Sequence, residues 1–109
     1  MHLLLAIVAT LRLTLICWPG STCGITLPER PSTVMVGDAT IAHISLDSQT
    51  LCIRARDSGS TMIVVGGATQ TIEIDLAVDR TYGQGLYDSG GGPIPMAACT
   101  QPLALLSIP

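Results

Sequence analysis

The sequence contains no lysine, no asparagine and no phenylalanine, and aromatic residues make up only 3% of its 109 residues. Without asparagine there is no acceptor for N-glycosylation. The charged residues are five arginines against eight acidic residues, a formal net charge of −3. No basic stripe is present, so a nucleic-acid partner is not expected. Because phenylalanine is absent, the core must be built from Ile, Val, Leu, Ala and Met.

The most apolar stretch lies at the N-terminus, over residues 3–18. It ends at Pro19 and Gly20, and small residues follow as far as Gly24. An apolar run that ends in a helix breaker and small side chains is typical of a secretory signal peptide. We therefore expect residues 1–23 to be a signal peptide and the protein to be secreted or periplasmic.

Two features of this stretch bear on the alternatives. Only Met1 and His2 precede the run, and Arg12 interrupts it. A membrane-spanning helix needs about 20 apolar residues, and a central charge is costly in lipid, so no stable membrane span is expected. The other reading of the run is a buried N-terminal helix or strand of an intracellular domain.

The number of cysteines in the mature chain depends on where a signal peptide would be cut. Cleavage after Cys23 leaves Cys52 and Cys99, whereas cleavage after Thr22 leaves an odd number. A disulfide between Cys52 and Cys99 would stabilise the domain by about 4 kcal/mol in the chain-entropy model. An exported chain permits that bond. Free, buried cysteines are the alternative.

Residues 24–109 are expected to form a single β-rich domain with an irregular C-terminal tail. Residues 70–78 alternate apolar and polar side chains, which is the period of a half-buried strand. Further strands are expected over residues 33–36, 39–46, 50–56 and 61–65. The run at 61–65 is continuously apolar, as in a strand covered on both faces. The apolar residues 103–108, between Pro102 and Pro109, are a candidate for a last strand.

Turn residues separate these strands at short intervals, at 57–60, 66–67, 82–85 and 88–93. Short strands at this spacing predict an all-β fold, a small antiparallel β-sandwich. An immunoglobulin-like arrangement is one form of that fold.

Two short motifs resemble protease motifs. Asp57-Ser58-Gly59-Ser60 resembles the catalytic loop of aspartic proteases, in which two carboxylates share a proton. Arg56 precedes it, and a guanidinium favours the ionised carboxylate, so a polar hairpin turn is the preferred interpretation. An active enzyme is not expected from this motif.

The second motif is Asp88-Ser89-Gly90-Gly91-Gly92-Pro93, which resembles the nucleophile loop of trypsin-like proteases. His43 and Asp75 precede Ser89 in the chain order of that family. Triads are defined by geometry, and fourteen residues from Asp75 to Ser89 leave no room for a second barrel. We expect no catalytic residues.

No cofactor or metal site is expected either. His43 is the only histidine after residue 23, and no cysteine or aspartate stands at ligand spacing from it. The glycine clusters lack both G-K-[ST] and G-x-G-x-x-G, the motifs that cradle phosphates.

The order of features from Ala39 to about Gly91 resembles the spore-coat-U domain and archaic chaperone-usher pilin domains. The residues that carry this resemblance are Cys52, Ser58-Gly59, Met62, Gly66-Gly67, 72–79 and Tyr82-Gly83-Gln84-Gly85. It implies a subunit of a surface structure. The size is similar also to that of the small chaperones of curli assembly.

These observations favour a non-catalytic secreted or periplasmic β-domain that acts in a surface structure or as an interaction module. Its partner would be a protein or a second copy, bound by strand pairing at an exposed edge such as residues 61–65. One alternative is an assembly chaperone or inhibitor of curli or pilus type. The other is a degenerate or fragmentary secreted hydrolase without activity.

Overall fold

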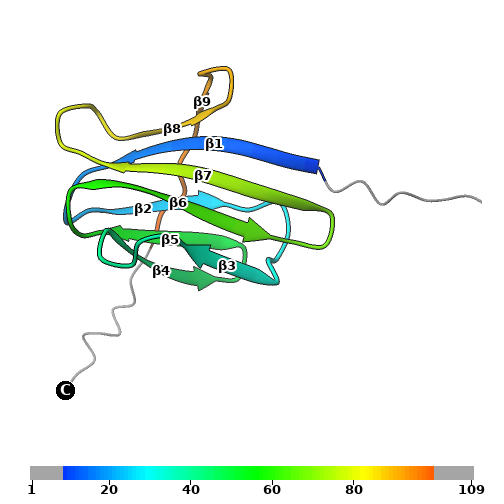
Figure 1. The fold of residues 1–109 in the computed structure, drawn as a ribbon. Helices are drawn as coiled ribbons and strands as arrows, with labels where there is room; N and C mark the ends of the chain where they lie inside the picture. Colours follow the sequence, from blue (N-terminus) through cyan, green and yellow to red (C-terminus); the bar gives the residue numbers. More distant parts are fainter. Residues whose placement is uncertain (1–8, 100–109) are drawn as a thin grey trace, which may run out of the picture.

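The computed structural model describes residues 9–99, which form nine strands in two sheets and no helix (Figure 1). One sheet has six strands in the order β3-β6-β7-β1-β8-β9, and the other has three in the order β2-β5-β4. The strands are β1 (Ala9–Cys17), β2 (Thr22–Thr26), β3 (Thr33–Val36), β4 (Ala42–Asp47), β5 (Thr50–Ala55), β6 (Gly59–Gly66), β7 (Gln70–Val78), β8 (Gly85–Asp88) and β9 (Pro93–Ile94). The predicted all-β sandwich is confirmed, and the immunoglobulin-like arrangement stays a prediction.

The core lies between the two sheets and follows from alternation along the strands. In β7, the even-numbered residues from Ile72 to Val78 are buried, whereas Asp75 is exposed. In β5, Leu51 and Ile53 are buried in the same cluster. Because successive side chains of a strand point to opposite faces, one apolar face of each sheet is removed from water. The described residues bury no polar or charged residue.

Strand β1 lies inside the larger sheet, between β7 and β8. It runs parallel to β7 and antiparallel to β8, so the sandwich departs from the expected purely antiparallel pattern. Its residues Leu13, Leu15 and Cys17 are buried in the core. The signal segment over residues 1–23 stays a prediction, and the structure adds that residues 9–23 pack within the two sheets.

Strand β6 is not an exposed edge, which corrects the expectation for residues 61–65. It pairs with β3 on one side and β7 on the other. The run is not covered on both faces either, because Ile63 and Val65 are buried while Met62 and Val64 are half-buried. On this outward face, Val64 lies between Met35 of β3 and Glu73 of β7.

One side of the sandwich is closed by the chain that follows β8. Strand β9 pairs with β8 in the larger sheet, and Ala97 then bridges to Gly24 of β2 in the smaller sheet. The Ala97 N–H donates to the Gly24 carbonyl at 2.9 Å. A Cβ at position 24 would lie 2.5 Å from the Ala97 carbonyl oxygen, so glycine permits this approach.

Two disulfides secure the ends of the described chain. Cys52 of β5 is bonded to Cys99, the pair considered from the sequence, and this bond holds the closing segment against β2 and β5. Cys17 is bonded to Cys23, which the sequence reasoning did not consider because both lay in the expected signal segment. Two disulfides indicate an oxidising compartment. Residues 9–99 contain no helix with the length and apolar character needed to cross a membrane. The expected strand at 103–108 lies outside the described residues.

Glu29 links two loops near one end of the sandwich. Its carboxylate accepts hydrogen bonds from the backbone N–H and the hydroxyl of Thr69, each at 3.0 Å. The N–H of Thr69 is the main reason that the pKa of Glu29 is lowered from its usual 4.5. Hydrogen bonds to the ionised form stabilise that form. The contact between the β2–β3 loop and the β6–β7 turn is therefore stronger when Glu29 is charged.

We expect the Glu29→Gln variant to lose part of the acid dependence of folding stability. A carboxyl group with a lowered folded-state pKa contributes stability above its unfolded pKa, and the contribution disappears as pH falls through the folded value. Urea unfolding between neutral pH and pH below 4.5 measures this difference. The variant should be slightly less stable at neutral pH and match the parent at the acid end. An equal gap at every pH would contradict the assignment.

Candidate functional site

The structure does not assemble the residues of a serine-protease triad. His43 is exposed on β4 of the smaller sheet, next to buried Ala42. Asp75 is exposed on β7 of the larger sheet, between buried Ile74 and Leu76. Each side chain thus points away from the core on the outer face of a different sheet. The thickness of the sandwich separates them, so they cannot share a hydrogen-bond network.

Asp88 and Ser89 form a turn. The Asp88 side-chain oxygen Oδ1 accepts hydrogen bonds from the N–H groups of Gly90 and Gly92, at 2.9 and 2.8 Å. The Asp88 carbonyl accepts another from Gly91, which has a positive φ of 86°. An aspartate that caps its own turn in this way explains the Asp-Ser-Gly-Gly pattern without catalysis.

Asp57 and Ser58 lie in the exposed connection between β5 and β6. Gly59, which follows them, has φ of 147°, a backbone conformation that favours glycine. Among residues 9–99, no group of three or more His, Cys, Asp or Glu side chains is placed to hold a metal ion. The motif therefore serves the turn that the sequence indicated.

His43, Arg54 and Arg56 form a row on the outer face of the smaller sheet. His43 of β4 lies directly opposite Arg54 of β5, and Arg56 follows on the same face. The three side chains line a shallow hollow of about 380 Å³. The ion pair recorded for the described residues, between Arg12 and Glu73, lies elsewhere, on the larger sheet. Within residues 9–99, Arg54 and Arg56 therefore form no ion pair.

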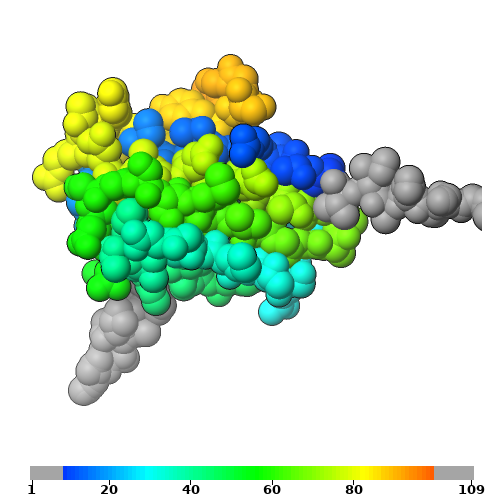
Figure 2. Space-filling model, in the orientation of Figure 1, coloured from blue at the N-terminus to red at the C-terminus, as the bar shows by residue number. Residues whose placement is uncertain are grey.

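The side of the sandwich opposite the closing segment is open. There, β3 ends the larger sheet and β4 ends the smaller one. Figure 2 shows the residues of β3, in teal, at the surface along the lower side of the molecule. A groove of about 320 Å³ runs between the two edge strands. It is lined by Val34, Val36, Ala39, Ala42, His43, Ile44, Ser45 and Leu46. We call it the open-edge groove.

The unpaired backbone groups of β4 can be assigned from its pairing with β5. The Arg56 N–H donates to the Ile41 carbonyl at 2.8 Å, which makes residues 41 and 56 a hydrogen-bonded pair. Such pairs alternate with non-hydrogen-bonded ones along an antiparallel ladder. The backbone groups of His43 and Ser45 thus point to β5, whereas those of Ile44 and Leu46 point outward from the sheet. These outward groups are free to pair with another strand.

Natural edge strands usually carry a feature that blocks such pairing, for example lysine, proline or a bulge. Strand β4 has none of these between Ala42 and Asp47, and its pairing with β5 is regular. Leu46 is 41% exposed at this edge, and Ile44 is half-buried against the core. The β4 edge combines free backbone groups with apolar side chains, which is the requirement for strand addition.

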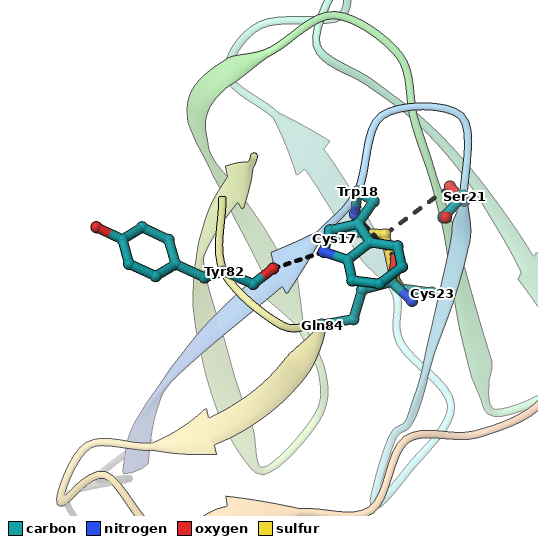
Figure 3. The surroundings of a disulfide bond; sticks show 6 residues. All are labelled: Cys17, Trp18, Ser21, Cys23, Tyr82 and Gln84. Atoms are coloured by element: carbon teal, nitrogen blue, oxygen red, sulfur yellow. Dashed lines mark hydrogen bonds between the residues drawn. A yellow bond between two sulfur atoms is a disulfide. The ribbon is translucent and has the colours of Figure 1, made fainter. Parts of the chain in front are cut away.

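A second exposed feature lies beside the Cys17–Cys23 disulfide (Figure 3). The indole N–H of Trp18 donates to the Tyr82 carbonyl, and the Trp18 backbone N–H donates to the Gln84 side-chain oxygen at 2.9 Å. Figure 3 shows the Tyr82 ring pointing away from Trp18. These contacts fix residues 82–84 against the chain just after β1 and give Trp18 a structural role. The two rings do not form one shared binding platform.

Comparison with known proteins does not assign a family: no family model matches the chain, and no curated protein matches it. Sequence reasoning predicted β4 as a strand and missed that it is an edge. No local pattern in residues 42–47 could have shown this, because the edge position of β4 follows from the order of strands in the sheet.

Proposed function

We propose that this protein is a non-catalytic β-domain of the extracellular space or periplasm that binds a protein partner by strand addition. The observation that carries the proposal is the unprotected β4 edge beside the open-edge groove. In strand addition, main-chain hydrogen bonds supply affinity, and pockets for alternate side chains supply specificity. The β4 edge offers the first, and the groove offers the second.

The groove defines what kind of strand would bind. A strand paired to β4 turns every second side chain inward, toward Val34 and Val36 of β3. These inward positions should be apolar, because the groove is lined mainly by aliphatic side chains. The outward positions would lie beside the row formed by His43, Arg54 and Arg56, where an acidic side chain is favoured.

The two disulfides support the extracellular or periplasmic part of the proposal. Disulfides form and persist in oxidising compartments and are rare in the cytosol. The intact mass of the protein recovered from the secreted or periplasmic fraction would test this directly. It should match an oxidised chain with both bonds present, and recovery of reduced chain from the cytosol alone would oppose the proposal.

We expect the Leu46→Arg variant to bind a strand-forming peptide at least about tenfold more weakly than the parent, since a charge would replace an apolar contact in the groove. The probe is a fluorescent peptide with isoleucine and threonine alternating, and its binding is measured by fluorescence anisotropy. Met35→Arg is the matched control, because Met35 is 63% exposed and does not line the groove.

Hydrogen exchange gives the second readout of the same experiment. Bound peptide should protect the amides of Ile44 and Leu46, which point outward, more than that of Ser45, which is already paired. Equal binding by the parent and Leu46→Arg, or protection confined to other strands, would contradict strand addition at β4.

A further inference from the structure

The proposed function leaves the partner open, and the sequence of β4 itself points to one. Resting on that function, we infer that the strand bound at β4 is β4 of a second copy of this chain. The two strands run antiparallel about a two-fold axis through Ser45. The pattern of charge, apolar side chains and free backbone groups along β4 is self-complementary in this register.

Charge complementarity sets the register. With Ser45 opposite Ser45 of the second copy, His43 of each copy lies opposite Asp47 of the other. Both are exposed and, like Ser45, they share the outer face of the smaller sheet. Asp47 thus faces an imidazole, which can hydrogen-bond a carboxylate, with Arg54 beyond it, and no two like charges face each other. A shift of the register by two residues in either direction removes these two matched pairs.

Arg54 extends this pairing across the sheet. Within one copy, His43 faces Arg54 on β5, and Arg56 lies beside them. The incoming Asp47 therefore meets a cationic row and not a single imidazole. The two arginines supply the positive charge of the row, because a guanidinium keeps its charge. The second copy supplies the carboxylate that the row lacks within the described part of one chain.

The apolar side chains fit the same register. Ile44 of one copy lies opposite Leu46 of the other, and both point to the inner face of the sheet, on the opposite side from His43. There they enter the groove of about 320 Å³ beside Val34 and Val36. Pairing thus covers Leu46, which is 41% exposed in the single chain. The hydrophobic effect and the charge pattern favour one and the same arrangement.

The alternation of inward and outward backbone groups along β4 supports the same register independently. Ile44 and Leu46 carry the outward N–H and C=O groups, so each Ile44–Leu46 pair between copies can exchange two hydrogen bonds. Ser45 then faces Ser45 as a non-hydrogen-bonded pair, with Cα atoms about 4.5 Å apart. The combined sheet would be continuous, in the order β2-β5-β4-β4-β5-β2.

The other open edge, β3, lacks this self-complementarity. Its four residues, Thr33–Val36, carry no charge, and Pro31 and Gly37 flank the strand closely. Nothing in β3 selects one register over another. The second copy is therefore assigned to β4, and β3 contributes the opposite wall of the groove.

The first test is a charge exchange, followed by sedimentation equilibrium over a series of concentrations. Asp47→Arg should raise the dissociation constant of the dimer at least about tenfold, because an arginine then faces the cationic row. His43→Asp should do the same by placing two carboxylates opposite each other. The double variant His43→Asp/Asp47→Arg should recover much of the association. Asp75→Arg, an exposed carboxylate on β7, is the matched control and should have no effect.

The second test reads the register. In the Ser45→Cys variant, the facing Cα atoms lie within the range that a disulfide spans. Under mild oxidation it should form a covalent dimer, seen by non-reducing electrophoresis, at least about tenfold faster than the Ser60→Cys variant. Ser60 is exposed on β6, an interior strand, and so tests random collision.

Each outcome decides between the two proposals. A parent protein that stays monomeric at every concentration overturns self-pairing, and so does equal crosslinking at positions 45 and 60. If the alternating peptide still binds such a monomer through β4, strand addition stands and the partner is a different protein. If neither the peptide nor a second copy binds, both proposals fail.

Discussion

A chain that begins at Gly24 will not fold into the domain described here. It lacks β1, which lies between β7 and β8 in the larger sheet. Leu13 and Leu15 of β1 are 5% and 0% exposed. Truncation of one buried leucine to alanine costs about 2–5 kcal/mol, and a domain has about 5–15 kcal/mol of stability in total. Loss of the whole strand also leaves the facing backbone groups of β7 and β8 without partners.

The measurement is thermal unfolding followed by circular dichroism. A chain that begins at Ala9 should unfold cooperatively, whereas the chain from Gly24 should show no cooperative transition. A peptide of residues 9–19, added to the shorter chain, should restore part of the transition by filling the gap between β7 and β8. Cooperative unfolding of the shorter chain alone would show that β1 is dispensable.

This result bears on export. If processing removes residues 1–23, as the sequence predicts, the place of β1 must be filled by another strand or the fold must rearrange. If processing removes fewer residues, β1 and the Cys17–Cys23 disulfide remain. The intact mass of the exported protein distinguishes the two cases, because the cut site sets both the mass and the number of retained cysteines.

The strands that the sequence predicted well are those with one clearly buried face. Residues 70–78 and 33–36 form β7 and β3 with the predicted bounds, and 50–56 differs from β5 by one residue. Alternation is a local signal, because it depends on which side of a single strand meets the core. It needs no knowledge of the neighbouring strands.

For the N-terminal run, a buried helix or strand was only the alternative to a signal peptide, because an apolar run suits both roles. A signal peptide and a buried strand are both rich in apolar side chains, and both can end at a proline such as Pro19. The two-residue alternation of a strand was nevertheless present in this run. Leu13 and Leu15 face the core, while Arg12 between Leu11 and Leu13 pairs with Glu73 on the outer face at 2.9 Å. An interrupting arginine weakens a signal peptide and is ordinary in a strand with one exposed face.

The candidate site could not be predicted because an edge is a property of the whole sheet. Whether a strand has one neighbour or two depends on pairings between residues that are far apart in sequence. Residues 61–65 are the more apolar segment, yet β6 is paired on both sides, whereas β4 is not. Local composition reports how well a strand packs and carries no information about which strands lie beside it.

Removal of the Cys52–Cys99 disulfide is expected to have the second large effect. Its cysteines are 47 residues apart, whereas Cys17 and Cys23 are 6 apart. In the chain-entropy model these bonds contribute about 4 and about 2 kcal/mol respectively. Urea unfolding of the Cys52→Ala/Cys99→Ala variant should therefore show a loss of about 4 kcal/mol, a large part of the stability of a small domain.

A local readout separates this loss from general destabilisation. The Ala97 N–H donates to Gly24 across the closed side of the sandwich, and Cys99 anchors that segment to β5. Hydrogen exchange at Ala97 should become fast in the Cys52→Ala/Cys99→Ala variant. It should stay slow in folded Cys17→Ala/Cys23→Ala, because that bond joins β1 to β2 and does not hold the segment that contains Ala97. If Ala97 stays protected without the Cys52–Cys99 bond, β9 and the Gly24 bridge alone hold that side closed. The segment that contains Ala97 would then stay in place without the disulfide, and the edges of β3 and β4 would remain the open side of the sandwich.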